Sequence, residues 1–174
     1  MYILYLLKKS ILILLILWSH YNFANPHVND KMKAVFIYNF LKYIHWPSEV
    51  DNSNFVIGIK DAPGLYEELM LITKIKSAIG NHAIIVKKID QFDESVNVLF
   101  VGNASSSNLG LLAEKSKQNH VLLISDIEGS IANGVCIELI IDTKKAEFDI
   151  SKKHLKENKL SVAQQLLDMA RNVE

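Results

Sequence analysis

Apolar residues recur at helical spacing through the stretch Lys33–Pro47. At about 100° per residue, one half of this predicted helix is apolar and the other half is polar. The apolar half comprises Phe36, Ile37, Phe40, Leu41, Tyr43 and Ile44. A stripe of that width is typical of a helix that packs on a larger core. We expect Pro47 to end the helix, because the residue before a proline is disfavoured in helical geometry.

Two apolar residues, Val35 and Tyr38, fall among the polar positions of this helix. One interpretation is that both lie at the edge of the buried stripe or under a neighbouring loop. The other is that the exposed side of the helix and its corner form a partner-binding surface. The candidate residues of that surface are Tyr38, Lys42, His45 and Trp46.

Short apolar runs alternate with helical patterns through the middle of the chain. The runs that are typical of buried strands are Phe55–Lys60, Ile84–Lys88, Asn97–Val101 and Val121–Ile124. Two intervening segments, Leu65–Lys74 and Leu109–Lys117, have apolar residues at helical spacing. Alternation of this kind predicts parallel strands joined by right-handed crossovers.

The pattern changes in the last third of the chain. Two predicted strands, Val135–Ile141 and Glu147–Ile150, are joined by four residues, which indicates an antiparallel hairpin. The chain closes with a predicted helix, Ser161–Val173, in which Ser161 and Gln164 are placed to form a capping box. The sequence therefore predicts an α/β fold: a three-layer domain around a mixed, largely parallel sheet of five or six strands, with a C-terminal antiparallel hairpin at its edge.

The first residues have the layout of a secretory signal peptide. Lys8 and Lys9 precede an uncharged apolar run, Ile11–Trp18, and a polar stretch follows. The apolar run is short for a membrane span. We predict a signal peptide over residues 1–24 and a single domain over residues 25–174. Retention as an uncleaved membrane anchor remains the alternative.

Composition narrows the classes of partner. The 174 residues carry 19 basic and 19 acidic side chains without a basic block, which argues against nucleic acid. The single cysteine, Cys136, excludes an intramolecular disulfide and a cysteine-based zinc site. Because Cys136 lies in a predicted apolar strand, we expect a buried, unreactive thiol.

The sequence indicates no catalytic centre. No serine has the spacing of a nucleophile elbow, and the six histidines are scattered singly, so we predict no catalytic residue, metal ion or cofactor. In an open α/β sheet, ligands bind where loops leave the carboxyl ends of the strands. The candidate crevice residues in those loops are Asn103, Ser105, Ser106 and Asp126. Asp126 and Glu128 also form a candidate cation site, with simple solvation as the alternative.

Several segments stand in an order and spacing that one known family shares. They are Ala34–Phe40 with Trp46-Pro47, Asn133–Ile137, Glu147–Ser151, and Leu160-Ser161 with Gln165–Ala170. In these segments the chain resembles the YfiR-like family of bacterial periplasmic regulatory proteins. The resemblance covers residues 31–173.

This resemblance implies a non-enzymatic periplasmic regulator. Its expected partner is an inner-membrane signalling protein, either a diguanylate cyclase, whose product is cyclic di-GMP, or a histidine kinase. Homodimerisation stays open. The better-known regulators of the family carry cysteine pairs, and since this chain has only Cys136, their redox control is not implied here. The alternative function is a periplasmic small-molecule receptor or weak hydrolase that uses the strand-end crevice.

Overall fold

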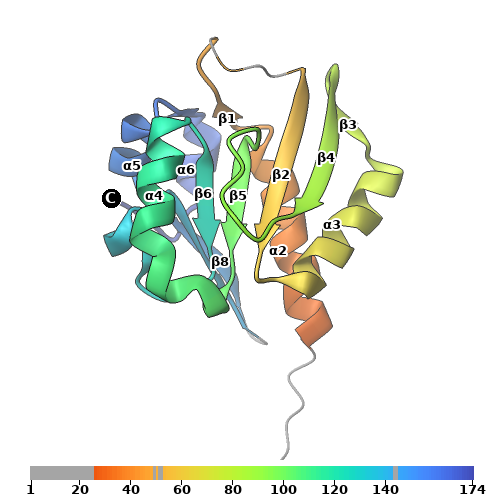
Figure 1. The fold of residues 1–174 in the computed structure, drawn as a ribbon, viewed down its shortest axis with the longest axis horizontal. Helices are drawn as coiled ribbons and strands as arrows, with labels where there is room; N and C mark the ends of the chain where they lie inside the picture. Colours follow the sequence, from red (N-terminus) through yellow and green to blue (C-terminus); the bar gives the residue numbers. More distant parts are fainter. Residues whose placement is uncertain (1–25, 49, 51–52, 143–144) are drawn as a thin grey trace, which may run out of the picture.

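The computed structural model describes residues 26–48, 50, 53–142 and 145–174 (Figure 1). The predicted signal peptide, residues 1–24, lies outside this part of the chain. The described residues form three layers, a central sheet with helices on both of its faces (Figure 1). This arrangement confirms the predicted three-layer α/β fold.

The central sheet contains six strands of four or more residues. They are β2 (Asn54–Lys60), β4 (His82–Lys88), β5 (Val98–Val101), β6 (Leu122–Ser125), β7 (Ile137–Ile141) and β8 (Ala146–Ile150). Four further strands have two residues each: β1 (Ile44–His45), β3 (Ala78–Ile79), β9 (Ser161–Val162) and β10 (Asn172–Val173). The α-helices are α2 (Pro26–Phe40), α3 (Pro63–Ile75), α4 (Leu109–Gln118), α5 (Lys152–Glu157) and α6 (Gln164–Met169), and the 3₁₀ helices are η1 (Asn103–Asn108) and η2 (Ser130–Asn133).

The strand order in the main sheet is β10-β8-β7-β6-β5-β2-β4-β3. The pairs from β4 to β7 are parallel, and β7 pairs with β8 as the predicted antiparallel hairpin. The hairpin is not at the edge, however, because β10 adds a short parallel strand outside β8. The sheet is therefore mixed and largely parallel, as predicted, and is extended at both edges by two-residue strands that have no sequence periodicity.

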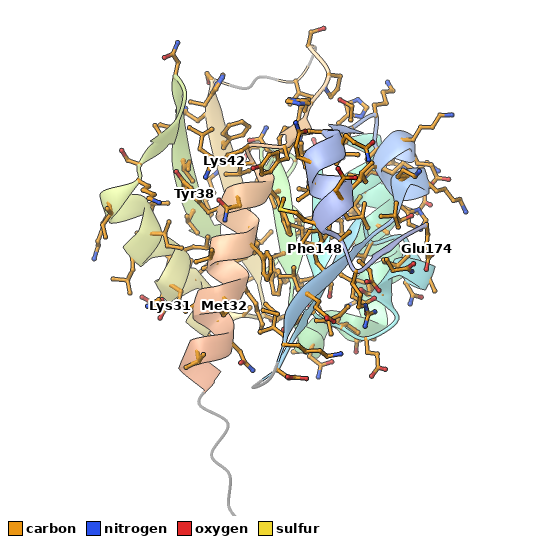
Figure 2. The ribbon with its side chains drawn as sticks, turned by 180° about the vertical axis from the view of Figure 1, so that it is seen from behind. Lys31, Met32, Tyr38, Lys42, Phe148 and Glu174 are labelled. Carbon is orange, nitrogen blue, oxygen red and sulfur yellow. The ribbon has the colours of Figure 1, made fainter. Side chains whose placement is uncertain are left out.

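The crossovers run in opposite directions from the centre of the sheet. The chain passes from β2 through α3 to β4 on one side, and from β5 through α4 to β6 on the other. Right-handed crossovers of opposite direction place their helices on opposite faces. Accordingly α4 covers the face seen in Figure 1, while α2, which packs on α3, lies in front in the reverse view of Figure 2 together with α6.

The first helix ends earlier than predicted. It stops at Phe40, where Lys42 and Tyr43 donate backbone hydrogen bonds to Asn39 and Phe40 in a turn. The following residues, Ile44–His45, form β1 and pair antiparallel with β9. The apolar pattern continues past Phe40 because Ile44 is also buried, although it lies in the strand β1 and not in the helix.

The predicted C-terminal helix, Ser161–Val173, is present only over Gln164–Met169, as α6, and its two ends are strands. Ser161 pairs with His45 in β9, and the N-cap of α6 is Ala163, which makes no side-chain cap bond. The side chain of Gln164 instead donates to Asp168, so the predicted capping box does not form. The sequence pattern gave no sign of α5, whose N-cap Ser151 accepts a hydrogen bond from the backbone N–H of His154 at 3.2 Å.

Candidate functional site

The described residues contain an apolar groove of about 440 Å³ between α2, β8 and α6, which we call the α2–α6 groove. Its lining residues are Phe36, Asn39, Phe40, Tyr43, Ala146, Glu147, Phe148, Leu166, Met169 and Arg171. A volume of this size lies within the range of sites that hold a small molecule or a protruding side chain of a partner. Figure 2 shows Phe148 beside α2 on this face of the sheet.

Three phenylalanine rings form the floor of the groove. Phe36 and Phe40 are one helical turn apart on α2, and their ring centroids lie 5.9 Å from each other. Phe148 comes from β8 and meets both rings edge-on, at 5.4 Å from Phe36 and 5.1 Å from Phe40. Because edge-to-face contacts fix the orientation of the rings, the floor is a preformed aromatic surface.

Charged and polar groups lie at the rim. Arg171 donates from Nε to Asp149 at 2.9 Å and from Nη2 to the other oxygen of the same carboxylate. The hydrogen bond from the guanidinium to Asp149 raises the pKa of Arg171 above its ordinary value, so the two side chains form an ion pair at the rim. Met169, 55% exposed on α6, adds a flexible apolar side chain at the opening.

The second sheet ties the walls of the groove together. β1 follows α2 and pairs with β9, which precedes α6. In addition, the backbone N–H of Ala163 donates to the carbonyl of Tyr43 at 2.8 Å. These contacts hold the C-terminal end of α2 against the N-terminal end of α6, and thus set the width of the groove.

The four predicted partner-binding residues do not form one surface. Tyr38 is 8% exposed, which agrees with the first of the two interpretations, burial at the edge of the stripe, and not with a place on an exposed surface: its ring packs between α2 and α3, with the ammonium groups of Lys42 and Lys76 at 4.8 and 5.6 Å from its centroid. Lys42 and His45 are exposed, as expected. His45, however, lies in β1 beside β9, away from the α3 side of the helix.

Trp46 is a structural anchor at the amino ends of the central strands. Its indole Nε1 donates to the carbonyl of Asn97 at 3.3 Å, and its ring contacts Phe55 at a centroid distance of 5.4 Å. The side chain is partly buried in these contacts. The predicted corner therefore packs on the sheet and leaves only part of the indole for a partner.

The predicted crevice at the carboxyl ends of the strands is closed between β2 and β5, the two central strands from which the crossovers run in opposite directions. Ser105 is buried in η1 and donates from its hydroxyl to the carboxylate of Asp61, which follows β2. Gly102 follows β5, and a Cβ at this position would lie 2.2 Å from the carbonyl oxygen of Asp61. The two loops thus pack on each other, and Asn103 and Ser106 remain exposed on the outside of η1. The prediction that these residues line an open crevice with Asp126 is wrong.

Asp126 lies in a different, polar groove of about 510 Å³, which it lines with Glu128, Glu138 and Lys33 among others. The ammonium of Lys33 is 2.7 Å from Asp126 and 3.1 Å from Asp30. Burial opposes the charge on Lys33, but the hydrogen bonds to these two carboxylates outweigh it and raise the pKa of Lys33. The cation held by Asp126 is therefore a lysine of the same chain.

Cys136 is buried, as predicted. Burial raises the pKa of its thiol to about 12, and the side-chain amide of Asn158 approaches the sulfur at 3.5 Å. In the part of the chain that the structure describes, no group of three or more His, Cys, Asp or Glu side chains is placed to hold a metal ion. Across the same residues, no helix has both the length and the hydrophobicity needed to cross a bilayer.

Sequence reasoning did not identify the α2–α6 groove. Its residues come from segments that are more than 100 positions apart, and only the tertiary structure brings them together. One signal was present: the segments Ala34–Phe40, Glu147–Ser151 and Gln165–Ala170, which carry the family resemblance, each contribute side chains to the groove. Grouping those segments in space would have led to this site.

Comparison with known proteins gives a family and a fold. A family model described as YfiR/HmsC-like matches residues 30–171. A crystal structure of a conserved domain protein from Vibrio cholerae O1 biovar El Tor has a similar fold, with a TM-score of 0.57 and 12% sequence identity. That match covers 83% of this chain and 60% of the other, so this chain spans less than two thirds of that protein, and at this identity the likeness shows the fold alone. Among curated proteins no match was found. Since the family model spans almost the whole described chain, the chain belongs to the YfiR/HmsC-like family.

Proposed function

We propose that this chain is a periplasmic regulatory protein that binds a membrane-bound signalling protein and controls its activity by contact. The partner would be a diguanylate cyclase, which makes cyclic di-GMP, or a histidine kinase. Family membership supports a regulatory role in place of a catalytic one. The protein would be exported by a signal peptide over residues 1–24, leaving residues 25–174 as one domain in the periplasm.

The observation that carries the proposal is the α2–α6 groove. Three segments that carry the family resemblance converge there. Of the three rings of the floor, which edge-to-face contacts fix, Phe40 and Phe148 are buried and Phe36 is partly exposed. An apolar surface with an Arg at its rim has the composition of protein–protein hot spots. The groove would accept an apolar side chain of the partner against Phe36 and Met169, while Asn39 and Arg171 would bind polar groups beside it.

The test is recovery of the partner by the tagged chain after mild crosslinking in the periplasm. We expect one membrane cyclase or kinase to be recovered with the unmodified chain and lost with Met169→Asp. This substitution places a charge at the groove opening, and it should not unfold the domain because Met169 is mostly exposed. The matched control is Leu111→Asp, which introduces the same charge at a residue that is 61% exposed on α4, the opposite face.

The outcome is read in two ways. Loss of the partner with Met169→Asp alone supports the groove, and a matching change in cellular cyclic di-GMP identifies the partner as a cyclase. Recovery of the partner to the same extent by both variants would show that the groove does not contact it. Equal melting temperatures of the two variants and the unmodified chain exclude unfolding as the reason for any loss.

A second candidate function is a small-molecule receptor that uses the same groove. The volume of about 440 Å³ and the polar rim of Asn39, Glu147 and Arg171 favour a small amphipathic molecule. Thermal shift measurements on the purified chain against a panel of amino acids and nucleosides test this function. A shift that Met169→Asp abolishes supports it, and the absence of any shift across the panel counts against it.

The exposed residues of the predicted partner surface, Lys42 and His45, remain part of the proposal. A substitution of His45 should weaken recovery of the partner without lowering the melting temperature. Lys42 does not serve as a test of this contact alone, because its ammonium also lies over the ring of Tyr38 on the other side of α2. Tyr38 is unsuited to this test, because it is buried and its replacement would disturb the contact between α2 and α3.

A further inference from the structure

The other side of α2 carries a second apolar surface, which it shares with α3. Val35 on α2 is 42% exposed, and Ile75 on α3 is 85% exposed. Between them lies a shallow groove of about 160 Å³, which we call the α2–α3 groove. Its lining residues are Val35, Tyr38, Asn39, Ile72, Ile75 and Lys76.

The exposed apolar residues of both helices extend this groove along its length. On α2, Val28 lies two turns before Val35 on the same side of the helix, and on α3, Leu71 lies one turn before Ile75. All four side chains are exposed although their helices pack closely on each other. Single exposed apolar residues are ordinary, but a stripe shared by two neighbouring helices marks an interaction surface.

Positive charge gathers at one end of the groove. Figure 2 shows Tyr38 and Lys42 close together near the C-terminal end of α2. Lys42 and Lys76 both place their ammonium groups over the ring of Tyr38, and Lys42 also donates to Asn39 Oδ1 at 2.8 Å. Within the described residues, neither lysine forms an ion pair with a carboxylate. The carboxylate on this side of α3, Glu68, is buried.

We propose that the α2–α3 groove binds an amphipathic helix of a second protein. The apolar stripe of that helix would lie along Val35 and Ile75, and acidic residues at one end of it would pair with Lys42 and Lys76. An amphipathic helix in a groove between two helices is a common recognition mode, because its side chains recur at the spacing of the groove. Because both lysines lie at one end of the groove, they determine which end of the partner helix carries the acidic residues.

The charge distribution distinguishes this occupant from two others. A second copy of the chain would bring the same exposed apolar residues, but among the described residues its own α2–α3 groove is lined by no carboxylate that could pair with the two lysines. A lipid surface is flat on this scale, whereas the lining from Val35 through Tyr38 to Ile75 is concave and fits a protruding side chain. An acidic helix satisfies both the shape and the charge.

Apart from one shared residue, this binding site uses different residues from the proposed regulatory contact. The α2–α6 groove lies on the other side of α2, and Asn39 is the one lining residue that the two grooves have in common. A chain that fails to bind a membrane signalling protein could still bind an acidic helix, and the reverse also holds. The two proposals therefore stand or fall on different variants.

The probe is a fluorescently labelled, designed helical peptide with leucines at i, i+4 and i+7 and glutamates flanking one end. A second peptide, with lysines in place of the glutamates, tests the charge. We expect the acidic peptide to bind the unmodified chain, and its affinity to fall about tenfold or more with Lys76→Glu and with Ile75→Asp. Lys74→Glu carries the same charge reversal on the solvent side of α3 and should leave affinity within about twofold, as should Leu111→Asp on α4.

Four outcomes would overturn the proposal. They are equal binding of both peptides; no binding of either peptide at millimolar concentration; binding that Lys76→Glu and Lys74→Glu weaken equally; and occupancy by another partner. For the last, sedimentation velocity showing a dimer that Ile75→Asp dissociates would identify a second copy. Binding to vesicles of phosphatidylglycerol and phosphatidylcholine that Ile75→Asp abolishes, with no peptide binding, would identify a membrane.

Discussion

Asn97 forms hydrogen bonds with both the backbone N–H and the backbone carbonyl of Val56. Its own N–H donates to the carbonyl of Val56 at 2.8 Å, and its side-chain Oδ1 accepts from the N–H of Val56 at 2.8 Å. The side chain thereby supplies a hydrogen bond that extends the pairing of β5 with β2 beyond the first ladder pair, Ile57 with Val98. The carbonyl of Asn97 also accepts the indole N–H of Trp46 and the backbone N–H of Leu122, so this buried asparagine joins its own segment to three others.

We expect Asn97→Ala to lower the free energy of unfolding by about 1–3 kcal/mol, because it leaves the partly buried N–H of Val56 without its acceptor. Urea denaturation followed by circular dichroism measures the change. Gln118→Ala, at an exposed position of α4, should stay within about 0.5 kcal/mol of the unmodified chain. Equal stability of the two variants would mean that water replaces the lost acceptor.

A pair of glycines tests the closed strand-end crevice. Gly102→Ala should destabilise the fold by about 1–3 kcal/mol or more, since its Cβ would overlap the carbonyl oxygen of Asp61, which cannot move without displacing backbone. Gly110→Ala should have the opposite effect, a gain of about 0.5–1 kcal/mol, because it lies in α4 with open space around it. Thermal denaturation of both variants checks this. If Gly102→Ala is tolerated, the two loops have room to separate.

The ion pair of Lys33 predicts a dependence of stability on pH. We expect Lys33→Met to cost about 1.5–3 kcal/mol near pH 7, because Lys33 hydrogen-bonds two carboxylates and is largely buried. The pKa of Lys33 is raised in the folded state above its ordinary 10.5. Its contribution is therefore full below pH 10.5 and is lost as pH rises through the folded value.

Urea denaturation of both chains as a function of pH tests this prediction. The stability difference between the unmodified chain and Lys33→Met should shrink as pH rises beyond 10.5. A difference that stays constant across this range would show that packing of the lysine stem, and not its charge, stabilises the site. Added calcium should leave the unmodified chain unchanged, since Lys33 already lies between Asp30 and Asp126.

The buried thiol should be inert in the native protein. With a pKa of about 12, Cys136 has about one thiolate in ten thousand at pH 8. We expect Ellman's reagent to label it only in denaturant, and Cys136→Ser to give the background. The thiol also destabilises the fold at high pH: the unfolded thiol ionises from about pH 8.5 while the folded thiol stays protonated, so stability falls from there up to about pH 12.

That fall in stability has its own check. The loss between neutral and alkaline pH should be smaller in Cys136→Ser, which has no thiol to ionise. Fast labelling of the native chain would contradict the burial of Cys136 that the structure describes.

The central sheet could be predicted because its elements are long enough to show a period. Runs such as Val121–Ile124 and the helix Leu109–Lys117 bury one face or both, so hydrophobicity alone locates them to within about two residues. The hairpin of β7 and β8 followed in the same way from two apolar runs with a short connection.

The short strands could not be predicted, because two residues carry no period. Ile44–His45 and Ser161–Val162 become strands only by pairing with each other across more than 100 positions. Both segments lie in patterns that predict a helix, and the tertiary pairing of the two strands overrides that local preference. The α2–α6 groove depends on this pairing, so the site was hidden for the same reason as the strands.

The place of Asn39 on α2, lining both grooves, has a thermodynamic consequence. A rigid helix that forms one wall of each of two sites cannot shift toward one occupant without shifting away from the other. Any such coupling is reciprocal: the factor by which one bound partner changes the affinity for the second equals the factor by which the second changes the affinity for the first. In a regulator with two such grooves, binding of one partner would change the affinity for the other. Measuring the affinity of each partner with and without the other bound would give the coupling free energy.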